Sequence, residues 1–282
     1  MIKKIAATFL LISVSFVFSG CTKEKRASTK IPERIVSLSP AGTEIICALD
    51  AMDQLAARTD FCDYPPEVSK LPSAGGFDGK IISLETVLSF NPDFVYLAEG
   101  MHDHLLPLLK QNGISYYISN ANSVESVIEE ILEIGKITGH FEKAKKLTAG
   151  IEQELNDLRK KYENTEPVSV YWEVWNPPYM SVGKDSFINE LIEYAGGKNI
   201  FSEIAQAYPI VSEEKIFSAK PEVIIIPDHV SDGIKSVKKR EGWKEIPAVK
   251  NNRIFEMDSD LVSRPSPRIA ETAEVIAKAL HE

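Results

Sequence analysis

The sequence is poor in cysteine, with three among 282 residues, and it has no surplus of basic side chains. Cys47 lies in an apolar helical pattern and Cys62 in a loop, without the framework of a disulfide-rich fold, so we expect free buried thiols. The formal net charge of −9 argues against a nucleic-acid partner, because the phosphate backbone would be repelled. With 44% apolar and 26% charged residues, the composition is that of a soluble globular protein.

Motifs of catalysis and of metal binding are also missing. There is no G-x-S-x-G and no H-E-x-x-H, and "GGFDGKI" lacks the spacing and the final Ser or Thr of a P-loop. His102 and His104 stand near an expected helix start, a pattern that favours surface histidines over metal ligands, and the other three histidines are scattered. The sequence therefore predicts a protein that is not an enzyme and that carries no cofactor or metal of its own.

The N-terminal segment has the pattern of an export signal. Lys3 and Lys4 precede an apolar run, residues 5–18, which is too short to span a bilayer, where about 20 residues are needed. The small residues before Cys21 resemble the lipobox of bacterial lipoproteins, although Phe18 stands where Leu is usual. We expect a signal peptide over residues 1–20 and lipidation of Cys21 on the extracytoplasmic side of the membrane; a plain cleaved signal is the alternative.

One phrase of the sequence occurs twice. "SLETVLSFNPDFVYL", which begins at Ser83, aligns without a gap with "SEEKIFSAKPEVIII", which begins at Ser212. The alignment pairs Glu85 with Glu214, and the tripeptide "AGG" precedes each copy. More than seven matching positions are unlike a chance similarity between two helix–strand units, so we expect two similar lobes.

The surrounding pattern alternates strands and helices, which is typical of parallel sheets with helical crossovers. Residues 123–163 read as helical with one interruption, and the second segment has apolar residues at the 3-and-4 spacing of one buried face. We predict an α/β fold with two similar Rossmann-like lobes, residues 33–140 and 166–282, the latter ending in a C-terminal helix. One long helix, residues 141–165, would join the lobes, and residues 21–32 would form the lipidated N-terminus and a linker.

Several phrases, in this order, resemble one family of binding proteins: "RIVSLSPAGTEI", "CDYPPE", "AGGF", "NPPYMSVGKDSF", "AGGKNIF" and "SRPSPRI". The chain is similar from Glu33 to Leu280 to the periplasmic solute-binding proteins of ABC importers that have a rigid helical hinge, and most of all to the vitamin B12-binding proteins. The resemblance implies a lipid-anchored protein that captures cobalamin, a corrinoid, in an interlobe cleft. It would deliver this ligand to an ABC permease dimer with its ATPase subunits.

The resemblance also implies which residues face the ligand. A corrinoid brings its own metal and needs aromatic area together with a few polar groups that bind amides. The aromatic residues implied are Tyr64, Phe77, Trp175, Tyr179 and Tyr208. Asp260 and Arg264 correspond to positions at the polar edge of the ligand, although Arg264 is equally consistent with a structural ion pair. Trp172, inside a strand pattern, is expected in the core.

Glu85 and Glu214 occupy the first turns of the two repeated helices, two residues after a serine that we expect to cap each helix. An acidic side chain there interacts favourably with the helix dipole. In the resembled family this pair docks onto basic pockets of the permease, which requires one matching contact from each lobe. Both roles are compatible.

The resemblance leaves the cargo open, because ferric-siderophore and haem binders share the scaffold. Anionic siderophores favour clefts rich in Arg and Lys, and the loops here offer only Lys80, Lys184 and Arg264, which favours cobalamin. The preferred corrinoid, the redox state of Cys47 and Cys62, and a contact between a histidine and the metal of the cargo stay open at this stage.

Overall fold

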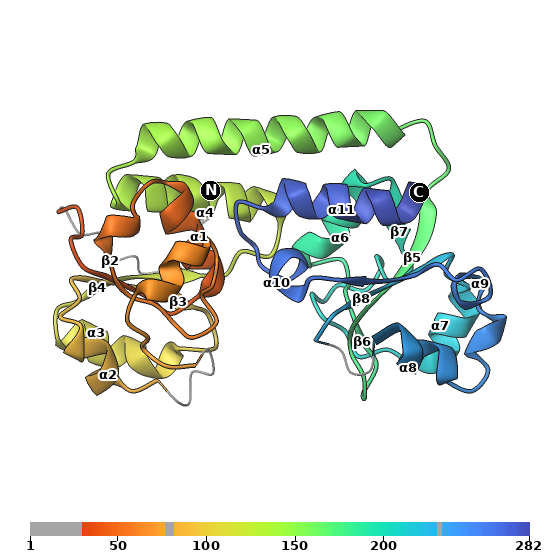
Figure 1. The fold of residues 1–282 in the computed structure, drawn as a ribbon, viewed down its shortest axis with the longest axis horizontal. Coiled ribbons are helices and arrows are strands. Elements are labelled where there is room, and N and C mark those ends of the chain that lie inside the picture. Colours follow the sequence, from red (N-terminus) through yellow and green to blue (C-terminus); the bar gives the residue numbers. More distant parts are fainter. Residues whose placement is uncertain (1–29, 77–81, 230–232) are drawn as a thin grey trace, which may run out of the picture.

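The computed structural model describes residues 30–76, 82–229 and 233–282. The signal peptide, Cys21, Phe77 and Lys80 lie outside these residues. Two α/β lobes stand side by side beneath one long helix (Figure 1). The predicted fold class is therefore confirmed.

The N-terminal lobe is built on a four-stranded parallel sheet in the order β2-β1-β3-β4. Its strands are β1 (Ile35–Ser37), β2 (Leu55–Ala57), β3 (Phe94–Ala98) and β4 (Ser115–Ser119). Its α-helices are α1 (Pro40–Ala48), α2 (Leu84–Ser89), α3 (Leu106–Gln111) and α4 (Val124–Ile137). Short 3₁₀ turns lie at Met52–Gln54, Pro66–Lys70 and Asp103–Leu105.

The C-terminal lobe repeats the plan with one addition. Its parallel strands are β5 (Val168–Trp175), β7 (Gly197–Asn199), β8 (Val223–Pro227) and β9 (Ile254–Met257). A short strand, β6 (Met180–Ser181), pairs antiparallel with the end of β5. The helices are α6 (Phe187–Tyr194), α7 (Glu213–Ala219), α8 (Gly233–Lys239), α9 (Pro247–Lys250), α10 (Ser259–Val262) and α11 (Ile269–His281), with a 3₁₀ turn at Trp243–Glu245.

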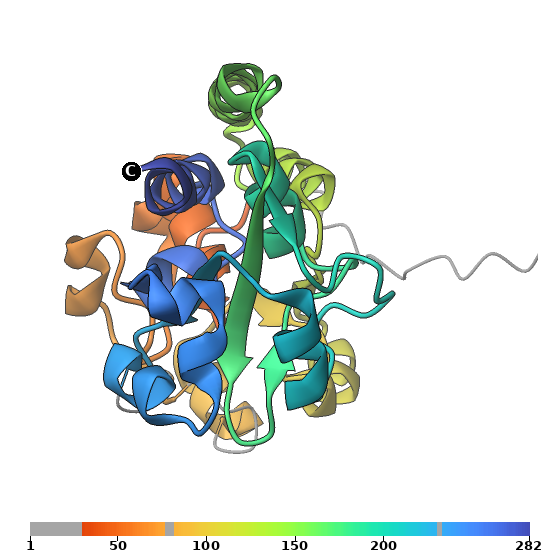
Figure 2. The same cartoon turned by 90° about the vertical axis from the view of Figure 1, so that its right-hand side faces the viewer.

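The joining helix α5 (Phe141–Tyr162) packs on α4 of the first lobe and on α6 and α11 of the second. Its buried residues, Ala144, Ile151 and Leu155, follow the predicted apolar face and belong to one core cluster with residues of both lobes. Figure 2 looks along α5 and shows it lying on top of both lobes. Because this core is shared, it fixes the orientation of the two sheets relative to each other.

The repeated phrase forms equivalent elements, since α2 leads to β3 in one lobe and α7 leads to β8 in the other. Ser83 caps α2 by accepting a hydrogen bond from the Thr86 backbone N–H, at 3.1 Å. Ser212 has nearly the same extended backbone, yet its side chain makes no such bond, so the prediction of a cap there was wrong. Its hydroxyl instead hydrogen-bonds the Glu214 side chain.

Two expectations about polar side chains have different outcomes. His104 is exposed as predicted, but His102 is fully buried, because the turn after β3 folds its ring back onto the strand end. There Nδ1 of His102 accepts a hydrogen bond from the Ala98 backbone N–H at 3.2 Å.

Cys47 and Cys62 are free thiols, as expected, the first half-buried and the second buried.

Candidate ligand-binding site

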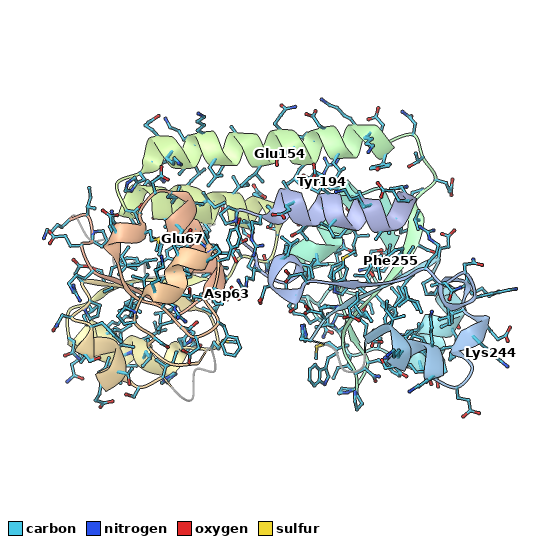
Figure 3. All side chains as sticks on the ribbon, viewed as in Figure 1. Asp63, Glu67, Glu154, Tyr194, Lys244 and Phe255 are labelled. Atoms are coloured by element: carbon cyan, nitrogen blue, oxygen red, sulfur yellow. The ribbon has the colours of Figure 1, made fainter. Side chains whose placement is uncertain are left out.

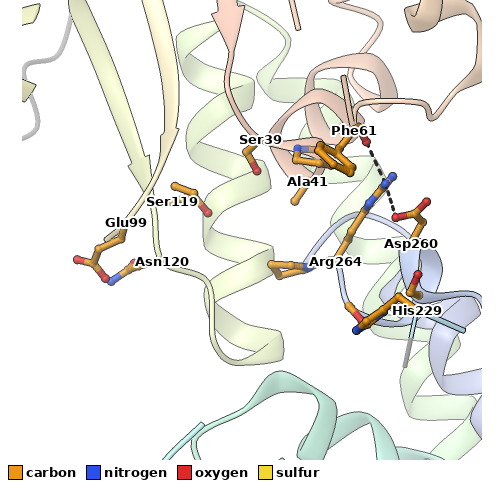
Figure 4. A pocket seen from close by; sticks show the side chains of 14 residues that line it. Ser39, Ala41, Phe61, Glu99, Ser119, Asn120, His229, Asp260 and Arg264 are labelled. Atoms are coloured by element: carbon orange, nitrogen blue, oxygen red, sulfur yellow. Dashed lines mark hydrogen bonds and ion pairs between the residues drawn. The ribbon is translucent and has the colours of Figure 1, made fainter. Parts of the chain in front are cut away.

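A cavity of about 560 Å³ lies between the lobes. Its walls come from the carboxyl ends of strands in both sheets, where ligand sites of parallel α/β folds are expected. The lining residues of the N-terminal lobe are Ser39, Pro40, Ala41, Phe61, Ala98, Glu99, Ser119 and Asn120. Those of the C-terminal lobe are His229, Ser259, Asp260, Ser263, Arg264 and Pro265. Figure 4 shows Glu99 and Asn120 across the cavity from Asp260 and Arg264.

The first turn of α1 is placed in the wall by a close approach to β3. Ser39 caps the helix, and Pro40 occupies its first position, where a missing N–H is tolerated. A Cβ atom at Gly42 would lie 2.2 Å from the Tyr96 ring, so only glycine permits this packing. The Tyr96 hydroxyl is held in turn by the buried carboxylate of Glu130.

Arg264 crosses from the C-terminal lobe to the N-terminal lobe. Its side chain is only 8% exposed, and Nη1 donates to Glu44 Oε1 at 2.9 Å and to Asp63 Oδ1 at 2.8 Å. Nη2 donates to the Phe61 carbonyl oxygen at 3.0 Å and pairs with Asp260 Oδ1 at 2.6 Å. The structural ion pair considered for Arg264 is thus present, and Arg264 also lines the cavity.

Arg268 makes a second crossing. Its Nε and Nη2 bind the two carboxylate oxygens of Glu44, each at 2.9 Å, and its guanidinium lies 4.0 Å from the Tyr64 ring centre. We call Glu44, Asp63, Asp260, Arg264 and Arg268 the interlobe charge cluster. Glu44, on α1, is nearly buried and is neutralised by two arginines from the opposite lobe.

The two aspartates of the cluster have pKa values shifted in opposite directions. Burial opposes ionisation of Asp63, but its hydrogen bond and charge interaction with Arg264 outweigh this effect and hold the pKa of Asp63 below its usual range. Burial and the neighbouring Asp63 raise the pKa of Asp260, against the attraction of Arg264. About half of each side chain is exposed, 53% for Asp63 and 52% for Asp260, so both remain accessible to solvent.

The residues expected at the ligand are distributed between the cavity and other surfaces. Asp260 and Arg264 line the cavity, and Tyr64 lies beside the interlobe charge cluster through its contact with Arg268. Trp175 and Tyr208 are large exposed rings of the C-terminal lobe, 48% and 45% exposed, that do not line this cavity. Exposed rings of this size supply apolar area for a partner or ligand.

Tyr179 lies deeper than expected for a ligand-facing ring. Its ring stacks on Trp243 with the centroids 5.7 Å apart, and its hydroxyl donates to Glu213 at 3.1 Å. Trp243 Nε1 donates to the same carboxylate oxygen at 2.5 Å. Trp172 is fully buried, as predicted.

Several lining residues were not anticipated. Phe61, 57% exposed, directly precedes the "CDYPPE" phrase, and Glu99 and Asn120 directly follow β3 and β4. The rule that ligand groups follow parallel strands would have identified the last two. Glu44 stands in an apolar helical pattern, and no local signal marks it as the partner of two arginines far along the chain. Lys184 is exposed and does not line the cavity.

Glu85 and Glu214 occupy matching positions on the two lobes, on the side opposite α5 (Figure 1). Both side chains are exposed. The backbone N–H of each glutamate and the preceding serine hydroxyl hydrogen-bond the carboxylate and lower its pKa, so both groups are ionised at neutral pH.

Within the described ranges, no helix has the length and apolar character needed to cross a bilayer. The same residues include no group of three or more His, Cys, Asp or Glu side chains placed to hold a metal ion. Two α/β lobes, a helical hinge and a cavity between strand ends define a two-lobed solute-binding protein. The chain belongs to the periplasmic binding protein family, whose model matches residues 35–261.

Two curated relatives have similar sequences. The vitamin B12-binding protein of Vibrio parahaemolyticus is 32% identical over 240 residues, which are 84% of this chain and 85% of the relative. The uncharacterised ABC transporter substrate-binding lipoprotein YvrC of Bacillus subtilis is 33% identical over 260 residues, which are 89% of this chain and 81% of the relative.

Solved structures give the same family and a range of cargoes. A possible iron-binding protein from Staphylococcus epidermidis is 29% identical, with a TM-score of 0.79 and coverage of 90% of this chain and 100% of that one. The vitamin B12-binding protein BtuF of Vibrio cholerae is 26% identical, with a TM-score of 0.74 and coverage of 89% and 97%. The haem-binding protein RhuT from Roseiflexus sp. RS-1 is 25% identical, with a TM-score of 0.78 and coverage of 88% and 98%.

Proposed function

We propose that this chain is a lipid-anchored solute-binding protein that captures cobalamin between its lobes and delivers it to an ABC importer. The observation that carries the choice of cargo is the charge of the cavity. Among the described residues that line it, Arg264 is the only Lys or Arg, and that arginine is already paired with three carboxylates. Such a wall suits a cargo with amide side chains better than an anionic chelate.

The proposed contacts follow from the exposed groups. The rings of Tyr64, Trp175 and Tyr208 would pack against the apolar parts of the corrinoid, and Tyr179 and Phe77 would add aromatic area. Asp260 would accept hydrogen bonds from amide N–H groups, and Arg264 would hold Asp260 in place. Relatives named for vitamin B12 binding support this assignment.

Delivery requires docking and a membrane address. Glu85 and Glu214 would insert into basic pockets of a two-fold symmetric permease, one from each lobe, and their exposure and ionisation support this role. Lipidation of Cys21 would keep the protein at the extracytoplasmic face of the membrane, and a relative named as a lipoprotein supports the anchor.

The experiment that tests this function measures uptake of labelled cyanocobalamin by cells that depend on this protein. We expect Glu85→Gln and Glu214→Gln each to lower uptake by about tenfold, and the double variant to lower it further, since each substitution removes one charged contact with the permease. The affinity of the purified variants for cyanocobalamin should stay unchanged.

A matched control is Glu154→Gln, which removes the same charge from the exposed face of α5, away from α2 and α7 (Figure 3). Normal uptake by the two docking variants, or equal loss by the control, would contradict the docking role. Absence of wild-type uptake would reject cobalamin as the cargo.

Haem or a ferric siderophore is the alternative cargo of the same scaffold. The exposed imidazole of His229, which lines the cavity, is a group that binds iron, and two solved relatives carry iron or haem in their names. Competition of haem or a ferric siderophore with cyanocobalamin for the purified protein distinguishes these cargoes.

A further inference from the structure

The two arginines of the interlobe charge cluster have few donors left for a ligand. A guanidinium group has five N–H donors, and Arg264 gives four of them to Glu44, Asp63, Asp260 and the Phe61 carbonyl. Arg264 is also nearly buried, so a ligand in the cavity cannot hydrogen-bond to these four N–H groups without displacing one of their partners.

Arg268 gives three of its five donors to protein partners. Nε and Nη2 bind both oxygens of Glu44, and Nη2 also approaches the Asp260 carbonyl oxygen at 3.3 Å. The Tyr64 ring covers the guanidinium plane at 4.0 Å. Neither arginine therefore presents the open, forked pair of donors with which arginine binds an incoming carboxylate.

The balance of charge is negative when the cavity and the adjoining interlobe charge cluster are taken together. Glu99, Asp260 and Arg264 line the cavity, and Glu44, Asp63 and Arg268 belong to the cluster beside it. These four acidic side chains against two guanidinium groups leave a formal excess of two negative charges. Glu99 is exposed on the opposite wall, and Asp63 and Asp260 are half exposed. An approaching carboxylate meets like charges, whereas an amide N–H meets acceptors.

We propose that Glu44 and Asp63 make the interlobe charge cluster a charge filter. They neutralise Arg264 and Arg268, so that the cleft accepts a cargo whose edge carries uncharged amides and rejects the same cargo when an amide is replaced by a carboxylate. This inference rests on the proposed function and assigns specificity to two residues that the family resemblance does not place at the ligand.

The test compares cyanocobalamin with its separated monocarboxylic acids, in which one corrin amide has been hydrolysed while the ring and the cobalt are unchanged. The full chain should bind at least one of these acids about tenfold or more weakly than cyanocobalamin. In Asp63→Asn the difference should shrink to about threefold or less, through a gain in affinity for that acid. Raised ionic strength should also narrow the wild-type difference, because salt screens charge repulsion at the exposed aspartates.

Glu67→Gln is the matched control. It removes one exposed acidic side chain from the same segment as Asp63 (Figure 3) but outside the interlobe charge cluster, and it should leave the affinity ratio unchanged. Asp260→Asn is the second variant, should Asp63→Asn fail to fold. Equal binding of cyanocobalamin and all its monocarboxylic acids by the wild type, or an unchanged ratio in the folded Asp variants, would overturn the filter.

Failure of the filter and failure of the proposed cargo give different results. If the wild type binds haem and does not bind cyanocobalamin, the proposed cargo is rejected, and the filter is tested by comparing haem with its dimethyl ester. The filter then predicts that the uncharged ester binds more tightly than haem. A preference for the free dicarboxylate would overturn the filter on any cargo.

Discussion

Glu44 is an acidic side chain that is only 3% exposed, and its position depends on residues more than 200 positions away in the chain. Burying one carboxylate without a partner would cost several kcal/mol, so α1 tolerates Glu44 only because Arg264 and Arg268 reach it from the other lobe. The same pairs occupy one donor of Arg264 and two donors of Arg268. Glu44 therefore helps to hold the two lobes together, and it reduces the number of arginine donors that the cleft offers to a ligand.

His102 provides a prediction about pH. Burial lowers its pKa below the ordinary value, so the unfolded chain binds a proton at higher pH than the folded chain does. The contribution of His102 to the free energy of unfolding is fully present above about pH 6.5. This contribution decreases as the pH falls from there toward the folded-state pKa of His102. Urea unfolding at a series of pH values between neutral and about pH 5 should show this loss, and His102→Gln should flatten it.

The control for that series is His104→Gln, which changes an exposed imidazole two residues away. The charge of His104 contributes to the lowered pKa of His102, but less than burial does, so this variant should flatten the slope of stability against pH less than His102→Gln does. Equal slopes for the wild type and for His102→Gln would show that His102 does not titrate as described.

At this scale the sequence predicts a residue well when its neighbours in the chain decide its environment. Ser83 caps a helix and Trp172 sits in a strand, and both were predicted from local pattern. The burial of His102 and the pairing of Glu44 depend on tertiary contacts, which no spacing in the sequence reports. The ligand roles of Tyr64, Trp175, Tyr179 and Tyr208 stay predictions.

At the scale of elements, the approach of α4 to α5 gives a matched pair of glycine substitutions. A Cβ atom at Gly135, on α4, would lie 2.4 Å from the Ala144 Cβ of α5, whereas one at Gly150, on α5, would meet no atom within 4 Å. Gly135→Ala should lower the free energy of unfolding by about 1–3 kcal/mol, because the two helices must separate. Gly150→Ala should raise it by about 0.4–1 kcal/mol, because alanine restricts the unfolded chain.

Denaturant unfolding of both variants tests this contrast. An equal effect of the two substitutions would show that the helices do not approach as closely as described. A gain in stability for Gly135→Ala would lead to the same conclusion.

The long elements were predicted because their periodicity is strong. The interruption between α4 and α5 and the buried face of α5 both follow the apolar spacing of the sequence. Strand β6 has two residues and β7 has three, too few for any period to develop, and β6 pairs antiparallel with β5 through a connection rich in proline. Such short strands are defined by their partners in the sheet and not by their own pattern.

At the scale of the whole molecule, two features hold the lobes together. One apolar cluster extends from the first lobe through α5 to the second, and the interlobe charge cluster ties α1 to the segment before α11. A further contact joins α4 to α6, where the Val124 backbone N–H donates to Glu190 at 3.0 Å. This construction favours a cleft whose width changes little when cargo binds, and it keeps Glu85 and Glu214 at a set separation for a symmetric partner.

Capture of cobalamin by rings of both lobes is tested by calorimetric titration of residues 22–282 with cyanocobalamin, carried out on the wild type, on Tyr64→Ala and on Tyr208→Ala. We predict saturable one-to-one binding that each variant weakens by about three- to tenfold, because each lobe contributes a ring to the same ligand. Absence of binding at concentrations on the order of tens of micromolar would contradict the claim. Binding that neither substitution weakens would contradict the assignment of these two rings to the ligand.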